Sequence, residues 1–498
     1  MEFLDQPLSP RKLWVFFFTA IFLFAYPLIL ADYFYIDDNW RAQEAGMAWK
    51  SDGRILVEWF YQGLSFTHGA PNMFPLPLLI AIAVMAFALR SLTTHYFSRP
   101  TVVSCLVVLP LWYSPFFLQN LSYQYDGPAM SLGVMSVIYA ISFSHSSWWG
   151  RTLSCSALIC VGLSLYQMVI NVYVGLCCIE LIRAVAEKQL PDQVFKLVRD
   201  KCLHLLLGVA MYVSTAYQLM NNNRSNLRYL GEGWTHGLMT DLHLAAQRFA
   251  LLYNEGNAWL CISLLIIAGL GMGLVIARAA RMSASMPLRV LLTGGCLATV
   301  PVMLISVPGL SLIFSFFNDG ARLLMGTAPA LVMLMYLAYQ ALTAIHRRLG
   351  YLLLLPIIAM LSFSYMYGRV LSLQRDLSAS IGQSLTYDIL SNKALKDTQR
   401  FYMINHSTNG WLVGSDGANA LVPALRYVVN VDFFLLSEML PRVGGITNIS
   451  SMDEQKFALV GAEETVQLLV DNKFYSIYIQ GSYGYIVMKT IPANDRYQ

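Results

Sequence analysis

Apolar runs long enough to cross a lipid bilayer occupy most of this chain up to residue 369. A bilayer core about 30 Å thick needs roughly 20 apolar residues in a helix. Since 56% of the residues are hydrophobic and only 12% are charged, the sequence predicts a polytopic α-helical membrane protein with about eleven transmembrane helices. The expected spans lie near 13–31, 75–95, 101–118, 127–145, 152–169, 170–187, 203–221, 258–277, 289–308, 325–345 and 350–369.

Lys and Arg residues are unevenly distributed between the two sets of loops. Fifteen fall in loops on the same side of the membrane as the N-terminus, and seven fall in loops on the opposite side. This bias predicts a cytoplasmic N-terminus and an exterior C-terminus. The first span lacks a small-residue cleavage site, so we expect a retained helix. The net charge of +4 follows from membrane orientation and does not indicate a nucleic-acid partner.

Hydropathy falls after the last span, which predicts two domains. Residues 1–373 would form the transmembrane domain, and residues 374–498 a small exterior α/β domain. Strand-like runs lie at 401–405 and 475–489. In the second run Gly481 and Ser482 separate two alternating arms, which predicts a β-hairpin.

The first exterior loop is the most charged segment near the membrane. Residues 32–58 hold six carboxylates, three basic residues and two tryptophans. If a helix begins here, Asp37, Arg41, Glu44 and Ala48 share one face. A carboxylate on that face could accept a proton from an attacking hydroxyl, while arginines neutralise a leaving phosphate. The alternative is that Asp37 or Asp38 caps the helix and Arg41 binds lipid headgroups.

Arg54 follows Gly53 in a polar turn, where a guanidinium suits bidentate phosphate recognition. Lipid headgroups would satisfy Arg54 equally well. The tryptophans at 40, 49 and 59 are expected to anchor this loop at headgroup level rather than to stack on substrate.

The next exterior loop is rich in groups that form hydrogen bonds to hydroxyls. These are Asn120, Tyr123, Gln124, Tyr125 and Asp126. Asp126 could instead cap the following helix. Two further basic residues, Arg322 and Arg369, are candidate phosphate ligands. For Arg322 the alternative is a local pair with Asp319.

Four motifs together carry a family resemblance: YFYIDDNWR, GMAWKSDGRIL, SPFFLQNLSYQYDGPAM, and SLYQ at 164–167. The chain resembles the Gtr-type O-antigen glucosyltransferases of serotype-converting bacteriophages and enterobacteria. The motifs cover the membrane half up to about residue 170, and the remainder is similar mainly in layout. The family is similar in architecture to the GT-C-like membrane glycosyltransferases, whose catalytic acid lies in the first exterior loop, here 32–74.

The resemblance implies transfer of glucose from undecaprenyl phosphate-glucose to the O-antigen of lipopolysaccharide, on the periplasmic face of the bacterial inner membrane. By position, the paired acids are Asp37 and Asp38, and the Gly-Arg element is Gly53 and Arg54. The chain departs from the family at Ile55, where the family has proline.

The expected mechanism is direct displacement at the anomeric carbon, with Asp37 or Asp38 as general base. Arginines would hold the departing polyprenyl phosphate: Arg54 with Arg41, Arg322 or Arg369. Acceptor or sugar contacts would come from Glu44, Asn120, Tyr123, Gln124, Tyr125, Asp126 and Gln167. A β-linked donor would give an α-glucoside. No nucleotide is needed, because the lipid phosphate already activates the donor. A divalent cation bridging Asp37, Asp38 and the phosphate is an alternative to the arginines as the source of positive charge.

Two other functions compete with this one. A flippase or transporter for polyprenyl-linked glycans would carry charged or broken helices at mid-membrane, whereas the spans here are nearly free of charge. Glu180 and Arg183 stand three apart near a cytoplasmic helix end, and we expect an ordinary helix pair there. A lipid-phosphate-sugar transferase acting on lipid A or protein would keep the chemistry and change the acceptor.

Overall fold

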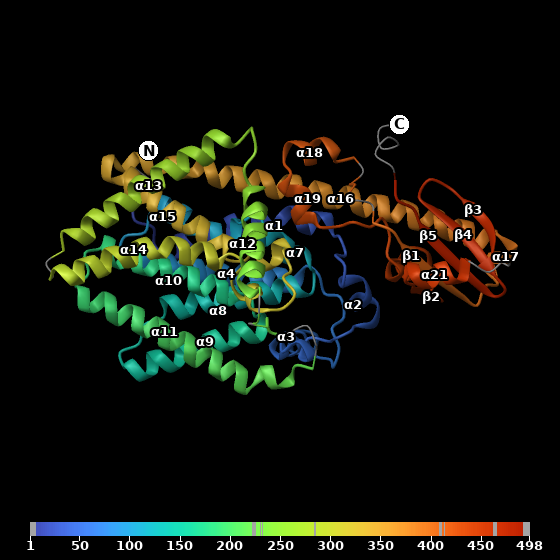
Figure 1. Ribbon diagram of the computed structural model, residues 1–498, viewed down its shortest axis with the longest axis horizontal. Helices are drawn as coiled ribbons and strands as arrows, with labels where there is room; N and C mark the ends of the chain where they lie inside the picture. Colours follow the sequence, from blue (N-terminus) through green and yellow to red (C-terminus); the bar gives the residue numbers. More distant parts are fainter. Residues whose placement is uncertain are drawn as a thin grey trace.

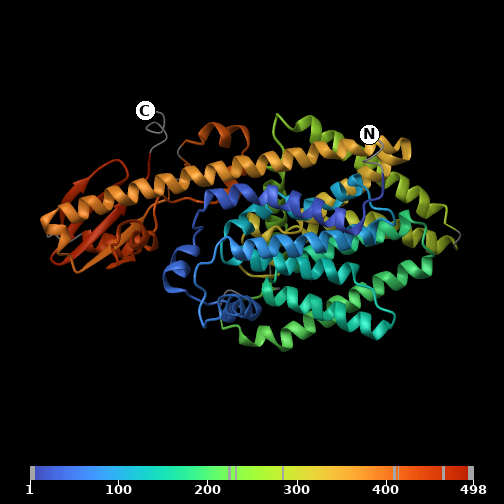
Figure 2. The ribbon, with the colours of Figure 1, turned by 180° about the vertical axis from the view of Figure 1, so that it is seen from behind.

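A computed structural model describes residues 6–221, 226–229, 231, 233–282, 285–407, 411–412, 414–461 and 466–491. Figure 1 shows two parts, a bundle of helices and a smaller part containing a β-sheet, joined by the long helix α16 (Leu354–Ser391). The first helix, α1 (Pro10–Ala31), begins at the end of the bundle farthest from the sheet, as the reverse view in Figure 2 also shows. Ser9 and Pro10 start α1 as a helix N-cap and first-turn proline, respectively.

Within the described residues, eight helices are long and apolar enough to cross a membrane. Two of them continue from or into a short 3₁₀ segment, η3 (Ala216–Leu219) after α11 and η7 (Arg347–Leu353) before α16. The chain is thus a multi-pass helical membrane protein, as the sequence predicts. The eight are α1, α4 (Leu76–Tyr96), α10 (Val169–Ala186), α11 (Pro191–Ser214), α13 (Ala258–Ala280), α14 (Met286–Ser306), α15 (Thr327–Ile345) and α16.

The three other expected spans are shorter, interrupted or less apolar. The run at 101–118 is divided into α5 (Val102–Val108), α6 (Pro110–Tyr113) and α7 (Phe117–Ser122). Pro110 and Pro115 lie at these breaks, since proline cannot continue the hydrogen-bond ladder of a preceding helix. The next two runs form α8 (Asp126–Ser142) and α9 (Trp148–Leu165). A break at residues 166–168 separates α9 from α10, so the closely spaced fifth and sixth runs are two helices.

The C-terminal part contains a five-stranded mixed sheet of order β2-β1-β5-β4-β3. The hairpin predicted at Gly481 and Ser482 is present, because β4 and β5 pair antiparallel from Tyr475 opposite Met488 to Gln480 opposite Tyr483. Gly481 has a φ of +58°, which suits glycine in a two-residue turn. The strands are β1 (Arg400–Asn405), β2 (Ile449–Ser451), β3 (Gln467–Asp471), β4 (Tyr475–Gln480) and β5 (Tyr483–Met488).

Helix α16 is continuous across residue 374, where the sequence suggests a domain boundary. Its membrane half packs on α1, and its far half lies under the sheet core with Ile381, Leu385 and Ile389. Residues that follow β1 return to the bundle, where Leu425 and Val428 join its core. The small helices of this part are α17 (Lys393–Lys396), α18 (Asp416–Leu421), α19 (Ala424–Val429), η8 (Ser437–Met439), α20 (Leu440–Gly444) and α21 (Glu454–Gly461).

The first interhelical loop lies at the end of the bundle that faces the sheet (Figures 1 and 2). It contains α2 (Asp38–Glu44), η2 (Lys50–Asp52) and α3 (Ile55–Ser65). The same end receives the segment between α14 and α15, with η5 (Gly309–Ile313) and η6 (Ala321–Leu323), and the crosswise helix α12 (Trp234–Ala250).

The C-terminal part rests directly on this first loop. Tyr35 Oη donates to the carbonyl of Val429 over 2.6 Å. Gln43 donates to the carbonyl of Glu438, and the Arg442 guanidinium lies 4.2 Å from the centre of the Phe34 ring. These contacts place the C-terminal part beside the acidic loop.

Candidate active site

Asp38 is a buried connector between the first and second interhelical loops. Its Oδ2 accepts the backbone N–H groups of Tyr35 (3.0 Å) and Gln124 (2.9 Å), and its Oδ1 accepts that of Tyr125 (3.3 Å). The residue is 0% exposed. Burial raises the pKa of Asp38 well above its ordinary value, and the three backbone hydrogen bonds oppose that rise. Its oxygens therefore bind backbone donors of the protein itself.

Asp37 lies one residue earlier and is only partly buried. It occupies the N-cap position of α2 but makes no side-chain capping bond. Its negative charge acts on both Tyr123 and Arg322. Asp37 and Asp38 thus have different surroundings although they are adjacent in the chain.

Helix α2 ends at Glu44, because Ala45 adopts a left-handed conformation. The expected helical face running from Asp37 through Arg41 and Glu44 to Ala48 is therefore wrong beyond Glu44. Arg41 is buried, whereas Glu44 is exposed to solvent. The helix is too short for the four residues to act together.

Asp126 is the centre of a charged cluster at the start of α8. Trp49 Nε1 donates to its Oδ1 over 2.9 Å, Arg41 Nε lies 3.7 Å from its Oδ2, and Arg54 Nη1 lies 3.5 Å from its Oδ1. The side chain of Asp126 thus binds the first loop rather than capping its own helix. Gly127 lets the start of α8 pack closely on the second loop, since a Cβ at this position would lie only 2.7 Å from the carbonyl oxygen of Asn120.

Trp49 differs from its expected role as a headgroup anchor. It is 0% exposed, stacks on Tyr61 at a ring-centre distance of 5.3 Å, and lies 4.1 Å from the Arg41 guanidinium. Trp59 is 60% exposed, as a headgroup anchor requires. Trp49 can be buried because its indole N–H has a hydrogen-bond partner in Asp126, which offsets the free-energy cost of removing that N–H from water.

Arg54 connects the first loop to the break between α9 and α10. Its Nε donates to Gln167 Oε1 over 3.1 Å, and its guanidinium lies 4.8 Å from the centre of the Tyr166 ring. Gln167 Nε2 in turn donates to the carbonyl of Asp52 (2.7 Å) and to Tyr212 Oη (2.9 Å). Gly53 has a φ of +71° and ends η2, which directs Arg54 toward this junction.

Arg322 comes from the segment between α14 and α15 and reaches the same region. Its Nη1 donates to Tyr123 Oη, its backbone N–H donates to Gln119 Oε1 over 2.6 Å, and its carbonyl accepts from Tyr166 (3.3 Å). Burial disfavours its charge, but the surrounding tyrosines and Asp37 keep its pKa above the ordinary value. Asp319 pairs with Arg248 over 2.6 Å, and no ion pair joins it to Arg322 among the residues that the structure describes.

Arg54 and Arg322 therefore lie on either side of Tyr166. Arg54 covers its ring, and the Tyr166 hydroxyl donates to the backbone of Arg322. Arg369, by contrast, is exposed on α16, and no hydrogen bond or ion pair joins it to this cluster in the part of the chain that the structure describes. Tyr166 is not among the site residues that the sequence predicts, although the motif SLYQ contains it beside Gln167.

The five candidate residues of the second loop, from Asn120 to Asp126, are all buried. Asn120 Nδ2 donates to the carbonyl of Arg322 over 3.1 Å, and Gln124 Nε2 donates to Asp32 Oδ1 over 3.0 Å. Several polar atoms of this region are buried without a hydrogen-bond partner in the described structure, among them Asn120 Oδ1, Gln124 Oε1, Tyr125 Oη, Arg41 Nε and Arg41 Nη1. Such atoms are rare in folded proteins and mark places where water or a ligand can bind.

A cation shared by Asp37 and Asp38 does not fit these surroundings. Both oxygens of Asp38 face amide N–H groups, whose partial positive charge would repel a metal ion. Among the residues that the structure describes, no group of three or more His, Cys, Asp or Glu side chains could hold a metal ion.

These features define a multi-pass membrane protein with a buried polar cluster at one end of its helical bundle. Residues 26–333 match the protein family described as Glucosyl transferase GtrII. The match covers more than half of the chain, includes every residue of the cluster around Asp126, Arg54 and Arg322, and shows that the chain belongs to this family of transferases.

A relative from Salmonella phage P22 is described as an uncharacterized 55.3 kDa protein in the gtrB 5' region. It is 25% identical over 256 residues, which are 48% of this chain and 52% of that protein. The chain thus spans about half the length of the curated relative that it matches. No solved structure matches the chain.

Proposed function

We propose that this protein transfers glucose from undecaprenyl phosphate-glucose to the O-antigen of lipopolysaccharide, at the periplasmic face of the bacterial inner membrane. Membership of a glucosyltransferase family supports glucosyl transfer. The proposed donor, acceptor and compartment follow the resemblance of the four motifs. In this orientation the N-terminus is cytoplasmic, and the polar cluster and the C-terminal part are periplasmic.

The observation that carries the proposal is the position of Arg322, which Tyr123 holds at this end of the bundle. Arg322 also lies within the electrostatic influence of Asp37. A fixed guanidinium and a carboxylate in the same polar region provide the two charges that displacement of a lipid phosphate requires. The cation stabilises the departing phosphate, and the carboxylate accepts the proton of the attacking hydroxyl.

We assign the base to Asp37 and a positioning role to Asp38. Asp38 has no exposed surface and binds three backbone N–H groups, so an acceptor hydroxyl has no access to it. Asp37 is partly exposed at the start of α2. Proton transfer requires contact between the base and the hydroxyl, and this requirement favours Asp37.

Arg54 is proposed as a second phosphate ligand, and Arg41 as its support. Arg54 keeps 23% of its side chain exposed, whereas Arg41 keeps only 6%. The buried atoms without partners, on Gln124 and Tyr125, are candidate contacts for a sugar. In this arrangement the second interhelical loop forms the sugar-binding wall of the site.

An apolar groove between α13, α15 and α16 offers a place for the isoprenoid chain of the donor. Leu264, Met335 and Phe363 line it, and it reaches Pro115, two residues before α7. Helix α7 carries Gln119, which holds the backbone of Arg322. A lipid chain in this groove would therefore end near the arginine that is proposed to bind its phosphate.

The test is glucosyl transfer by the purified full chain, with undecaprenyl phosphate-glucose as donor and O-antigen as acceptor. Asp37→Asn is expected to reduce kcat by about 10²-fold to 10⁴-fold with unchanged thermal unfolding. Full activity of this variant would eliminate Asp37 as the base. Absence of transfer by the wild type, together with movement of the labelled lipid across vesicles, would favour the flippase alternative. Separate reactions with lipid A and with protein identify a different acceptor.

A further inference from the structure

A second polar site lies at the opposite end of the bundle from the acidic loop. Helices α4, α8 and α10 each begin near the first site and end here, and α11 begins here. Between them is a cavity of about 430 Å³. The glucosyl transfer proposed above makes no use of it.

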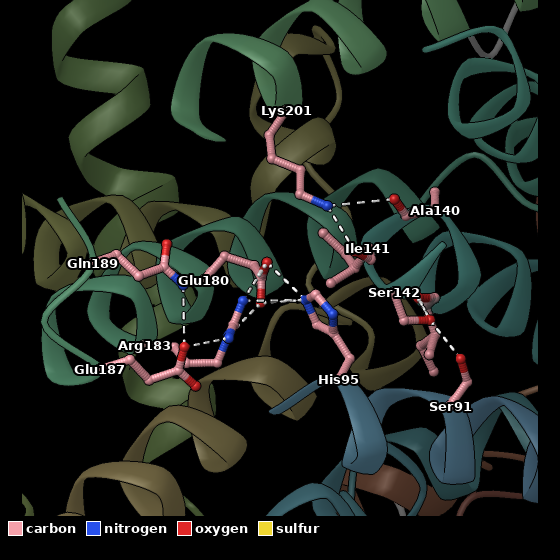
Figure 3. Close-up of polar contacts among 11 residues, drawn as sticks. Ser91, His95, Ala140, Ile141, Ser142, Glu180, Arg183, Glu187, Gln189 and Lys201 are labelled. Atoms are coloured by element: carbon pink, nitrogen blue, oxygen red, sulfur yellow. Dashed lines mark hydrogen bonds and ion pairs between the residues drawn. The ribbon is translucent and has the colours of Figure 1, made fainter. Parts of the chain in front are cut away.

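Figure 3 shows the part of the polar network around this cavity that contains His95, Glu180, Arg183 and Lys201. Glu180 Oε2 lies 3.0 Å from His95 Nε2, and its Oε1 accepts from Arg183 Nε over 3.1 Å. Glu187 also binds Arg183, over 2.8 Å. Glu180 and Arg183 are thus the helix pair expected from their spacing, with a histidine of α4 added by the fold.

The other carboxylate of the cavity is also fully engaged. Asp200 binds Arg151 over 2.8 Å and Arg199 over 2.8 Å, and it accepts from Trp148 Nε1 over 3.4 Å. Five Lys and Arg side chains line the cavity against these two carboxylates: Arg151, Arg183, Lys196, Arg199 and Lys201. The lining therefore carries an excess of positive charge.

Lys201 is 8% exposed. Its ammonium donates to the carbonyl of Ile141 over 2.7 Å and lies 3.5 Å from that of Ala140, at the end of α8 (Figure 3). The ammonium of a lysine has three N–H donors, and these two carbonyls use two of them. Lys201 also lines the cavity, so its third N–H is available to a ligand there.

His204 provides the second, independent indication of a ligand. It lines the same cavity, one helical turn after Lys201, and is 2% exposed. Neither ring nitrogen has a hydrogen-bond partner in the described structure. An unpaired buried imidazole is costly, and a ligand with acceptor oxygens would satisfy it together with the Lys201 ammonium.

We propose that this cavity binds a phosphate group. A phosphate has several acceptor oxygens and a negative charge, which match the unpaired donors of His204 and Lys201 and the excess of cations. The source is either the headgroup of an anionic phospholipid or free phosphate. The membrane surface supplies the first, since Trp149 (67% exposed) and Leu190 (64% exposed) directly follow the lining residues Trp148 and Gln189 in the chain.

Binding is measured on the full-length protein in nanodiscs of phosphatidylcholine, by native mass spectrometry, with phosphatidylglycerol added as lipid probe and inorganic phosphate as soluble probe. Preferential retention of phosphatidylglycerol identifies a lipid headgroup. Binding of inorganic phosphate without such retention identifies the free anion. Retention of neither probe would overturn the proposal.

Variants locate the bound group in the cavity. His204→Phe is expected to weaken binding about tenfold, because it removes an N–H donor, and Lys196→Gln about threefold to fivefold, because it removes a positive charge. Arg348→Gln, an exposed arginine at the same end but outside the cavity, is the matched control. Because Lys196 is exposed, its substitution should not impair folding. Lys196→Gln therefore tests whether phosphate binds in the cavity even if His204→Phe fails to fold. Equal affinities of Lys196→Gln, Arg348→Gln and wild type would overturn the proposal.

Discussion

Trp49 donates its indole N–H to the carboxylate of Asp126 over 2.9 Å, across 77 residues of sequence. The contact joins the first interhelical loop to the start of α8. It also orients the carboxylate toward Arg41 and Arg54. This buried hydrogen bond thus joins the contacts of Asp38 and Arg54 in holding the loop that carries the candidate phosphate ligands.

Trp49→Phe keeps the aromatic ring and removes its N–H. Because Asp126 is buried and loses one donor, we expect the free energy of unfolding to fall by about 1–3 kcal/mol. Thermal unfolding in detergent measures this loss. Trp59→Phe, at a position 60% exposed, is the control and should leave the unfolding temperature unchanged. Equal stability of both variants would show that the Asp126 contact contributes nothing.

Asp38→Asn, compared with Asp37→Asn, tests whether Asp38 has a structural role and Asp37 a chemical one. The amide retains one acceptor oxygen and points an N–H₂ group at backbone donors, so we expect a stability loss of about 2–4 kcal/mol. Asp37→Asn should unfold like the wild type. The two variants are compared by thermal unfolding before any assay. The reverse order of stability would contradict the positioning role of Asp38.

Arg322→Lys tests the arginine that Tyr123 holds in the proposed site. Lysine keeps the charge but cannot reproduce the planar guanidinium that binds Tyr123. We expect kcat for glucosyl transfer to fall by at least about 10²-fold. Arg369→Lys, at an exposed position on α16, should retain wild-type kinetics. Loss of activity in Arg369→Lys with normal Arg322→Lys would transfer the phosphate-binding role to α16.

Tyr35→Phe tests how the C-terminal part is held on the first loop. The change leaves the carbonyl of Val429 and the Nε2 of Gln119 without their partner, at a cost of about 1–3 kcal/mol. Hydrogen exchange should become faster in α19 and remain unchanged in β4 and β5. Uniform acceleration across the sheet would instead indicate global destabilisation.

Local patterns were sufficient for several elements of the fold. Apolar runs predict the long helices, the alternation on either side of Gly481 predicts the hairpin, and the charged run at 32–58 predicts a polar end of the bundle. Prolines 110 and 115 explain why one apolar run is interrupted, a feature that hydropathy averages over. The sequence does not predict where α2 ends. The expected helical face continues to Ala48, whereas the left-handed conformation of Ala45 ends the helix at Glu44.

The sequence by itself determined that this is a polytopic membrane protein, with its acids and arginines in loops at helix ends. Only the tertiary structure decided which of two adjacent aspartates is buried, that Asp126 binds Trp49 rather than caps α8, and that Arg322 comes to Tyr123 across 199 residues. Hydropathy and periodicity are local properties of the chain. The partner of a buried charge depends on which distant segments the packed helices bring together.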